Sequence, residues 1–176
     1  HEFRRAVKGG VGEAKTGGNY AASLFCSEDA AKRGFTQVLW LDAIEGRFVE
    51  EVGAMNICFV YDGKLIKTPA LSGSILPGIT RDSLLQLAPT LDYEVEESKL
   101  DIQQIIDDIS SGKITEVFGC GTAAVVSPVG KIAMKDKEYV INGGKTGPVA
   151  SKLFETLTAI QYGVIDDPFN WIVSVD

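Results

Sequence analysis

Residues 55–64 read MNICFVYDGK, a run of apolar, β-branched and aromatic side chains that ends at Asp62 and Gly63. Such a run, closed by turn-forming residues, is typical of a buried strand followed by a tight turn. A second run of this kind, TQVLWL, occupies residues 36–41, and the turn-forming stretch AIEGR lies between the two. The sequence therefore predicts strands at 36–41 and 55–61.

Helical patterns flank these strands. Residues 20–35 predict one helix that stops at Gly34, and residues 80–88 carry an amphipathic pattern. Two further helices are predicted, one over residues 101–112 and one that begins at Pro148, which is a favoured residue at the first helical position. The side chains expected to face inward from the second and the last of these helices are Leu84, Leu85, Leu87, Ala88, Leu153, Leu157 and Ile160.

More strands are expected in the second half of the chain. Residues 116–134 (EVFGCGTAAVVSPVGKIAM) read as strands around a tight glycine turn, and residues 138–144 (EYVINGG) read as one more. Helical and strand patterns alternate along the chain, with no internal repeat and no low-complexity tract. The predicted fold class is therefore α/β, a mixed α+β domain.

Composition narrows the class of protein. The chain has 176 residues, which suits one domain with a sizeable core. Lys and Arg total 17 against 24 Asp and Glu, for a net charge of -7, and no basic run is interleaved with aromatic residues, so a nucleic-acid partner is not expected. Hydrophobic residues make up 45%, but no apolar run approaches the roughly 18 to 20 residues that a bilayer span requires, so no membrane partner is expected either.

The cysteines and the histidine exclude several kinds of site. Cys26, Cys58 and Cys120 are odd in number and far apart, so neither a disulfide framework nor a zinc site is predicted, and a reducing compartment, the cytoplasm, fits best. The chain has one histidine, His1, in an opening HEF that resembles a tag or cloning remnant. Histidine-based nucleophile pairs and histidine metal ligands are therefore excluded, which leaves Lys, Tyr, Asp, Glu or a cofactor.

A glycine-rich stretch, GGVGEAKTGGNY at residues 9–20, surrounds Lys15. The phosphate loop of nucleotide-binding proteins needs a lysine directly after the last glycine, whereas Glu13 and Ala14 separate Lys15 from the preceding glycine. A later Gly-Lys-Thr has Tyr139 where the first glycine of that loop belongs. Neither stretch predicts a nucleotide loop, and composition alone favours an exposed loop lysine.

Six segments in order resemble the branched-chain amino acid aminotransferases, which are class IV pyridoxal-phosphate enzymes. They are GGVGEAKTGGNYAASL, QVLWLDA, EEVGAMNICFVY, TPALSGSILPGITRDSLLQLA, EVFGCGTAAVVSPVGKI and AIQYG. The resemblance implies the large C-terminal domain of that fold, with strands wrapped as a pseudo-barrel and flanking helices. It implies that residues 6–176 form the cofactor-binding domain, that residues 1–5 are a tag remnant and a truncated domain start, and that a small N-terminal domain is absent.

The resemblance also implies a set of site residues for pyridoxal 5'-phosphate. Lys15 would be the lysine that binds the cofactor covalently and later acts as the base, and Tyr20 would bond the ring oxygen. Glu51 would pair with the pyridine nitrogen, whereas its neighbour Glu50 suits a solvated strand end, because successive strand residues point to opposite faces. Leu76 would pack on the ring, although a core leucine would look the same.

Backbone turns would hold the phosphate and the substrate. The phosphate would sit at the helix start Gly78, Ile79 and Thr80, where free N–H groups and the helix dipole favour an anion, and at Gly121 and Thr122. The substrate would meet Ala54, Ala123 and Ala124, as the resemblance implies. Each threonine also has an ordinary explanation, Thr80 as a helix cap and Thr122 as a turn residue.

The activity that the resemblance implies is exchange of an amino group between leucine, isoleucine or valine and 2-oxoglutarate, in a homodimer. Two alternatives share the cofactor chemistry, a D-amino acid aminotransferase and an aminodeoxychorismate lyase. A third alternative is a cofactor-binding piece with little or no turnover, because other parts of the family's active site come from the N-terminal domain and from the dimer interface.

Overall fold

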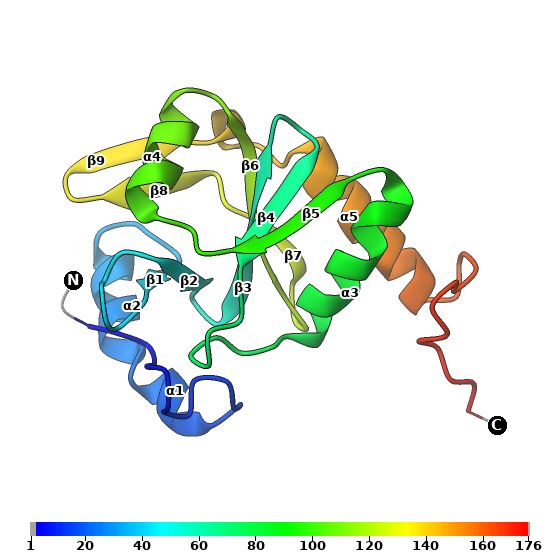
Figure 1. The fold of residues 1–176 in the computed structure, drawn as a ribbon, viewed down its shortest axis with the longest axis horizontal. Coiled ribbons are helices and arrows are strands. Elements are labelled where there is room, and N and C mark those ends of the chain that lie inside the picture. The colour runs from blue at the N-terminus through cyan, green and yellow to red at the C-terminus, as the bar shows by residue number, and fades with distance from the viewer. Residues whose placement is uncertain (1–2, 176) are drawn as a thin grey trace.

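A strongly twisted sheet runs through the part of the chain that the computed structural model describes, residues 3–175 (Figure 1). Over those residues it has seven strands, and a separate two-stranded hairpin lies beside it. The sheet strands are β1 (Leu39–Leu41), β2 (Val49–Val52), β3 (Met55–Tyr61), β4 (Leu65–Pro69), β5 (Glu94–Ser98), β6 (Ile114–Gly121) and β7 (Val125–Pro128), and the hairpin is β8 (Lys131–Met134) and β9 (Lys137–Val140). Helices accompany the strands, which confirms the predicted mixed α/β class.

The sheet forks at β3. Asn56 in β3 lies opposite Glu51 of β2 on one edge and opposite Cys120 of β6 on the other edge. Further along β3, Phe59 lies opposite Lys67 of β4, again on the edge away from β6. Strands β2 and β4 therefore share one edge of β3 and continue into two arms, one ending in β1 and the other in β5. Because β4 and β5 run parallel, a helical crossover joins them.

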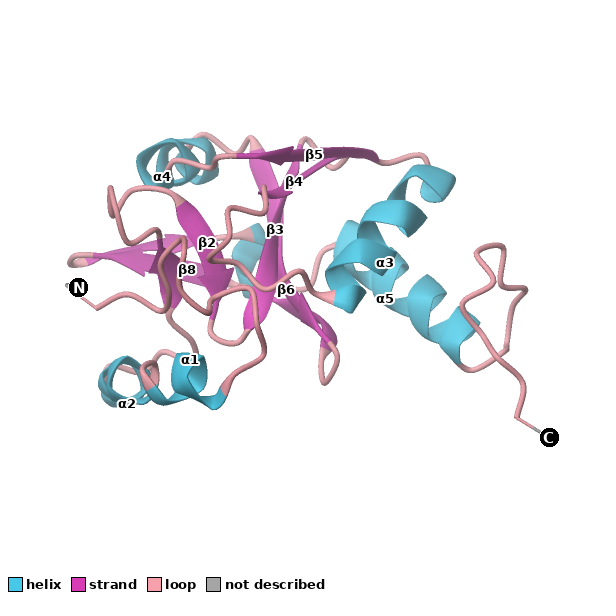
Figure 2. Ribbon diagram, turned by 60° about the horizontal axis from the view of Figure 1, so that its bottom comes forward, coloured by secondary structure: helices cyan, strands magenta, loops and turns pink. Residues whose placement is uncertain are grey.

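Helices cover both faces of the sheet. They are α1 (Gly17–Ala21), α2 (Leu24–Lys32), α3 (Ile79–Leu87), α4 (Ile102–Ser110) and α5 (Pro148–Gln161), with short 3-10 turns at Ala88–Leu91 and Asn142–Gly144. Figure 2 shows α3 and α5 side by side on one face, and α4 on the other side with the β8–β9 hairpin nearby. Two buried clusters follow from this layering, one around Phe118 and Leu153 under α3 and α5, the other around Phe59 and Ile105 under α4.

The first predicted helix differs from the structure. The chain forms two helices, α1 and α2, where one was predicted over residues 20–35, and Leu24 and Phe25 are each 65% exposed. Gly34 adopts a φ of 82° just after α2, so the predicted stop is confirmed. Strands β4 and β5 were not predicted, because their sequences LIKTP and EVEES are rich in charged and turn-forming residues. Residues His1 and Glu2 of the expected tag remnant lie outside the described residues.

The three cysteines Cys26, Cys58 and Cys120 are buried and form no disulfide. Among residues 3–175, no helix is both long enough and apolar enough to cross a bilayer.

A buried carboxylate closes the start of α5. Pro148 opens this helix, as predicted, and the two oxygens of Glu116 in β6 accept hydrogen bonds of 2.9 Å from the N–H groups of Val149 and Ala150. These N–H groups have no partner within the helix, and a negative charge at a helix N-terminus is stabilised by the helix dipole. Glu116 is 3% exposed and therefore ties α5 to the sheet from inside the protein.

Replacing Glu116 by glutamine is expected to lower the free energy of unfolding by about 2 kcal/mol, because one of two charge-assisted hydrogen bonds is lost and the amide NH₂ faces an N–H group. Urea unfolding of the cofactor-free chain at pH 7 measures the loss. Glu138→Gln is the control, since Glu138 is an exposed carboxylate in β9 that pairs with Lys131 on the surface. Equal stability of the two variants would contradict the assigned role.

Candidate functional site

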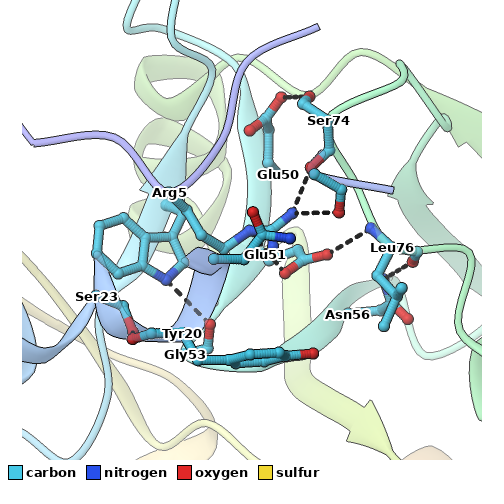
Figure 3. Close-up of polar contacts among 12 residues, drawn as sticks. Arg5, Tyr20, Ser23, Glu50, Glu51, Gly53, Asn56, Ser74 and Leu76 are labelled. Carbon is cyan, nitrogen blue, oxygen red and sulfur yellow. Dashed lines mark hydrogen bonds and ion pairs between the residues drawn. The ribbon is translucent and has the colours of Figure 1, made fainter. Parts of the chain in front are cut away.

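Glu51 is buried at the fork of the sheet and has partners on both carboxylate oxygens. It is 3% exposed. Its Oε1 accepts a 2.8 Å hydrogen bond from the N–H of Leu76, and its Oε2 lies 3.0 Å from Nε of Arg5. Figure 3 shows these contacts converging on Glu51 from a loop after β4 and from the first residues of the chain. A carboxylate has room for about four hydrogen bonds, so Glu51 keeps acceptor capacity for a further donor.

Burial raises the pKa of Glu51 to about 6, and the Arg5 charge and the Leu76 N–H oppose this rise. The neighbouring Glu50 carboxylate adds to the rise. A cationic or N–H donor bound beside Glu51 would favour its ionised form, since an opposite charge or a donated hydrogen bond lowers a carboxyl pKa. The site is therefore suited to a positively charged ring nitrogen.

Arg5 is buried and holds two segments of backbone in addition to Glu51. It is 8% exposed, and its Nη2 group donates to the carbonyl oxygens of Ser74 and Gly12, the latter at 3.2 Å. The glycine-rich loop and the loop after β4 are thus fastened to the same guanidinium. Arg5 places the Glu51 carboxylate relative to both loops.

Asn56 connects the remaining parts of the candidate site. Its Nδ2 donates 2.9 Å to the carbonyl of Leu76, and a side chain at Gly78 would overlap its Oδ1. Asn56 also lies opposite Glu51 on one edge of β3 and opposite Cys120, which precedes Gly121, on the other. Through Asn56 the structure brings Glu51, Leu76, Gly78 and the end of β6 together.

The start of α3 offers free backbone donors. Gly78 occupies the position before the helix in an extended conformation, and no side chain caps the first turn. The side chains of Ile79 and Thr80 are not buried, and a cavity of about 200 Å³ lies along Gly78 and Ile79. Free N–H groups at a helix start are a general site for phosphate. Phosphate binding at Gly78, Ile79 and Thr80 stays a prediction, and the structure leaves their backbone groups available for it.

The turn after β6 is the second predicted phosphate site. Gly121 ends the strand, the side chains of Thr122 and Ala123 are exposed, and Ala124 is half-buried. Val125 adopts a φ of 56°, an unusual value for a branched residue, so the backbone here is constrained to a tight turn. The exposed Ala54 lies in the turn between β2 and β3, so the three alanines predicted at the substrate come from two turns.

Lys15 lies in the loop before α1, exposed and without a hydrogen bond or ion pair to any described residue. The loop itself is held by Asn19, whose Nδ2 donates to the carbonyl oxygens of Val11 and Ala14 at 2.8 and 2.9 Å. No direct contact joins Lys15 to Glu51 or to α3 within the described chain. Tyr20 is half-buried in α1, and Figure 3 shows its ring below the Glu51 carboxylate.

The structure corrects the interpretation of Glu50. This residue was predicted to be a solvated strand end, but it is 4% exposed, and Ser74 Oγ donates a hydrogen bond to its Oε1. Both faces of β2 are covered here, so alternation along the strand did not place Glu50 in water. Sequence reasoning also gave no role to Arg5, Asn56 or Ser74. The only signal was the segment EEVGAMNICFVY of the resemblance, which includes Asn56.

A cavity of about 1070 Å³ lies elsewhere, between α2, β1 and the β8–β9 hairpin, and none of the predicted site residues lines it. The candidate site is therefore defined by its converging polar groups rather than by this cavity.

The geometry above has a counterpart among known families. Residues 2–132 match the family described as Amino-transferase class IV. The chain belongs to this family. One curated relative is a probable branched-chain-amino-acid aminotransferase of Staphylococcus epidermidis, which is 55% identical over 99% of this chain and 48% of the relative. Another is branched-chain-amino-acid aminotransferase 2 of Bacillus subtilis, which is 50% identical over 99% of this chain and 48% of the relative. The class IV chain spans about half the length of these relatives.

Solved aminotransferase structures resemble the fold of this chain over about half of their own length. A branched-chain amino acid aminotransferase from Escherichia coli superposes with a TM-score of 0.83 at 30% identity and covers 99% of this chain and 54% of its own. A second, from Thermobaculum terrenum in its PLP-form, has a TM-score of 0.72 at 32% identity and covers 86% and 45%. The mixed sheet and helices of this class IV chain thus match those of aminotransferase structures.

The described residues fit a phosphorylated pyridine cofactor. A buried carboxylate with a raised pKa and spare acceptor capacity suits a ring N–H, and the uncapped start of α3 suits a phosphate. Asn56 fixes the loop between these two features. An unpaired lysine in the glycine-rich loop supplies an amine that no other described group engages.

Proposed function

We propose that the chain binds pyridoxal 5'-phosphate through Lys15 and carries out the chemical part of amino-group exchange between branched-chain L-amino acids and 2-oxoglutarate. The observation that carries this proposal is the buried Glu51 carboxylate, held by Arg5 and by the N–H of Leu76 beside the uncapped start of α3. The names of the relatives and of the solved structures support the substrate class.

Each residue of the site has a defined task in this proposal, and Lys15 has two. Lys15 binds the cofactor covalently and then, as a free amine, moves a proton at the substrate Cα. Glu51 holds the ring nitrogen in its protonated form, and Tyr20 donates to the ring oxygen. When bound, pyridoxal phosphate supplies an electron sink that stabilises negative charge at the substrate Cα.

Backbone groups complete the proposed site. Gly78, Ile79 and Thr80, together with Gly121 and Thr122, hold the phosphate, and Leu76 packs against the ring. The turns that contain Ala54, Ala123 and Ala124 meet the substrate. Residues 6–176, together with Arg5, which is buried against them, act as the cofactor-binding domain, and a second subunit completes the active site in a cytoplasmic homodimer. A small N-terminal domain would supply further contacts, so we expect weak turnover from this chain alone.

The test is a single-turnover measurement on the complete 176-residue chain. The chain is loaded with pyridoxal phosphate, and L-leucine is added in stoichiometric excess. The expected result is a slow release of the corresponding 2-oxo acid, detected by mass spectrometry, with no release from D-leucine. If the 2-oxo acid is released from D-leucine and not from L-leucine, the chain is instead a D-amino acid aminotransferase. If the chain forms 4-aminobenzoate from aminodeoxychorismate, it is instead an aminodeoxychorismate lyase.

A second candidate function is cofactor binding without turnover. It is favoured by one observation, that the chain spans about half the length of the relatives it matches. Borohydride reduction followed by peptide mass spectrometry separates the candidates. A label on Lys15 without any release of 2-oxo acid would establish the binding module and overturn transamination by this chain.

A further inference from the structure

Glu50 is a buried acid to which the proposed function gives no task. It directly precedes Glu51 in β2, and the two carboxylates are 4% and 3% exposed. Its Oε2 has no hydrogen-bond partner among the described residues, although the atom is inaccessible to solvent. Burying a carboxylate without full hydrogen bonding is costly, so its presence here calls for a function.

Ser74 links Glu50 to the candidate site. The Ser74 hydroxyl donates to Oε1 of Glu50, and the carbonyl oxygen of the same residue accepts from Nη2 of Arg5. Arg5 in turn pairs with Glu51 at 3.0 Å. Figure 3 shows this path from Glu50 through Ser74 and Arg5 to Glu51. Two consecutive acids of one strand thus reach the same guanidinium from opposite faces, one directly and one through a serine.

Ser74 also seats the glycine-rich loop. A Cβ atom at Gly12 would lie 2.7 Å from the Cα of Ser74, so only glycine allows the two backbones to approach this closely. The carbonyl of Gly12 accepts a hydrogen bond from Arg5. The loop that carries Lys15 therefore rests on Ser74, and the position of Ser74 is set by Glu50.

The groups around Glu50 do not fully stabilise its negative charge. Burial raises the pKa of Glu50, and the carboxylate of Asp42, after β1, adds to this rise. The hydroxyls of Ser74 and Ser72 and the charge of Arg5 favour the ionised form of Glu50, but they do not outweigh burial. Since one guanidinium faces two acids, any change in the charge of Glu50 acts on Glu51.

We propose that Glu50 is a positioning residue: it holds Ser74, and through Ser74 it fixes the Lys15 loop and Arg5, the ion-pair partner of Glu51. The inference rests on the proposed function for the tasks of Lys15 and Glu51. Glu50 itself touches neither cofactor nor substrate in this proposal. It acts through the serine and the arginine.

The test is a carboxyl titration of the complete cofactor-free chain by NMR with ¹³C-labelled glutamate. The Glu51 signal is identified by its loss in Glu51→Gln. Glu50→Gln keeps the shape of the side chain. In this variant the pKa of Glu51 is expected to fall, because the nearby negative charge of Glu50 is removed and Glu51 becomes the one acid that faces Arg5. Glu45→Gln is the matched control, since Glu45 is an exposed acid in the turn before the same strand. An unchanged Glu51 titration in Glu50→Gln would overturn the proposal.

A second measurement covers the positioning of the loop. Ser74→Ala keeps the carbonyl that Arg5 binds but removes the hydroxyl that binds Glu50, so the rate at which pyridoxal phosphate labels Lys15 is expected to drop several-fold. Ser110→Ala is the control, since the Ser110 hydroxyl donates only to the carbonyl of Ile106 within α4, and this variant should retain most of the rate. Equal labelling rates in Ser74→Ala and in the unchanged chain would refute the link to the loop.

The outcomes separate this inference from the proposed function. If Glu50→Gln shifts the Glu51 titration but pyridoxal phosphate never labels Lys15, the network stands and the cofactor assignment fails. If Lys15 is labelled but neither variant has its expected effect, the cofactor assignment stands and the positioning role of Glu50 fails.

Discussion

Replacing Lys15 by alanine is expected to abolish covalent capture of pyridoxal phosphate completely. Lys15 is exposed and makes no hydrogen bond or ion pair with a described residue. It lies in a loop whose shape depends on Asn19 and Gly12 rather than on the lysine. Its removal should therefore change the free energy of unfolding by no more than about 0.5 kcal/mol, as for an ordinary surface position. Borohydride reduction and peptide mass spectrometry measure the capture, and urea unfolding measures the stability.

Lys8→Ala is the control for this experiment. Lys8 precedes the same glycine-rich loop and is also exposed, so it shares the solvent access of Lys15 without its proposed task. We expect Lys8→Ala to be labelled at Lys15 as strongly as the unchanged chain. A label on Lys8 or Lys145 in the unchanged chain, or one that persists in Lys15→Ala, would remove Lys15 from the site.

Replacing Arg5 by alanine is expected to lower the free energy of unfolding by about 3 to 5 kcal/mol at pH 7, the usual cost of leaving one member of a buried ion pair alone. The change strands the Glu51 carboxylate and removes the donor from the carbonyl oxygens of Ser74 and Gly12. Urea unfolding measures the loss. Arg33→Ala is the control, because Arg33 is an exposed arginine that lies over the ring of Phe35 at the surface, 6.0 Å from the ring centroid.

The loss caused by Arg5→Ala should depend on pH in a definite direction. Burial already raises the pKa of Glu51 to about 6 with Arg5 present, and without that positive charge the pKa rises further. Below this pKa Glu51 is neutral and no stranded charge remains, so the variant should recover part of its stability as the pH falls from 7 to 5. The double variant Arg5→Ala with Glu51→Gln should show less of this recovery. A loss that is the same at both pH values would argue against the ion pair.

Strands and helices that are specified by their own residues and the adjoining turns were predicted well from the sequence. The run MNICFVY forms β3 with the predicted bounds Met55–Tyr61, and the helix predicted over residues 80–88 forms as Ile79–Leu87. The helix predicted over residues 101–112 forms as Ile102–Ser110, and Gly112 follows it with a φ of 77°. In each case the signal and the structure that it determines lie within a few residues of each other.

Features that depend on distant partners were not predicted. Strand β5 is charged and half-exposed, and it is a strand because it pairs in parallel with β4 across a helical crossover. Glu50 was interpreted as a solvated strand end, and Arg5 was assigned to a tag remnant and truncated domain start. Each is instead buried by its partners from other segments. Neither partnership leaves a pattern in the neighbouring sequence.

Within the candidate site the same division holds. The resemblance implied phosphate contacts at backbone turns such as Gly78 and Gly121, where the structure has a helix start and a tight turn. Their role in binding stays a prediction. The interpretation of Glu50 was wrong because alternation along a strand assigns faces, and both faces of β2 are covered. Asn56 is part of the segment EEVGAMNICFVY, but its hydrogen bond to Leu76 is visible only in the structure, because it depends on the position of the loop after β4.

The fork at β3 sets an order for folding. Pairing of β3 with β2 and with β4 closes short loops and can occur early, whereas pairing with β6 must close a long one, which costs more chain entropy and is slower. Since Asn56 lies opposite Cys120, the turn at Gly121 reaches Glu51 only in that later step. A refolding chain therefore brings together the two turns of the proposed phosphate site late, so under the proposed function the rate of pyridoxal phosphate capture would report the docking of β6.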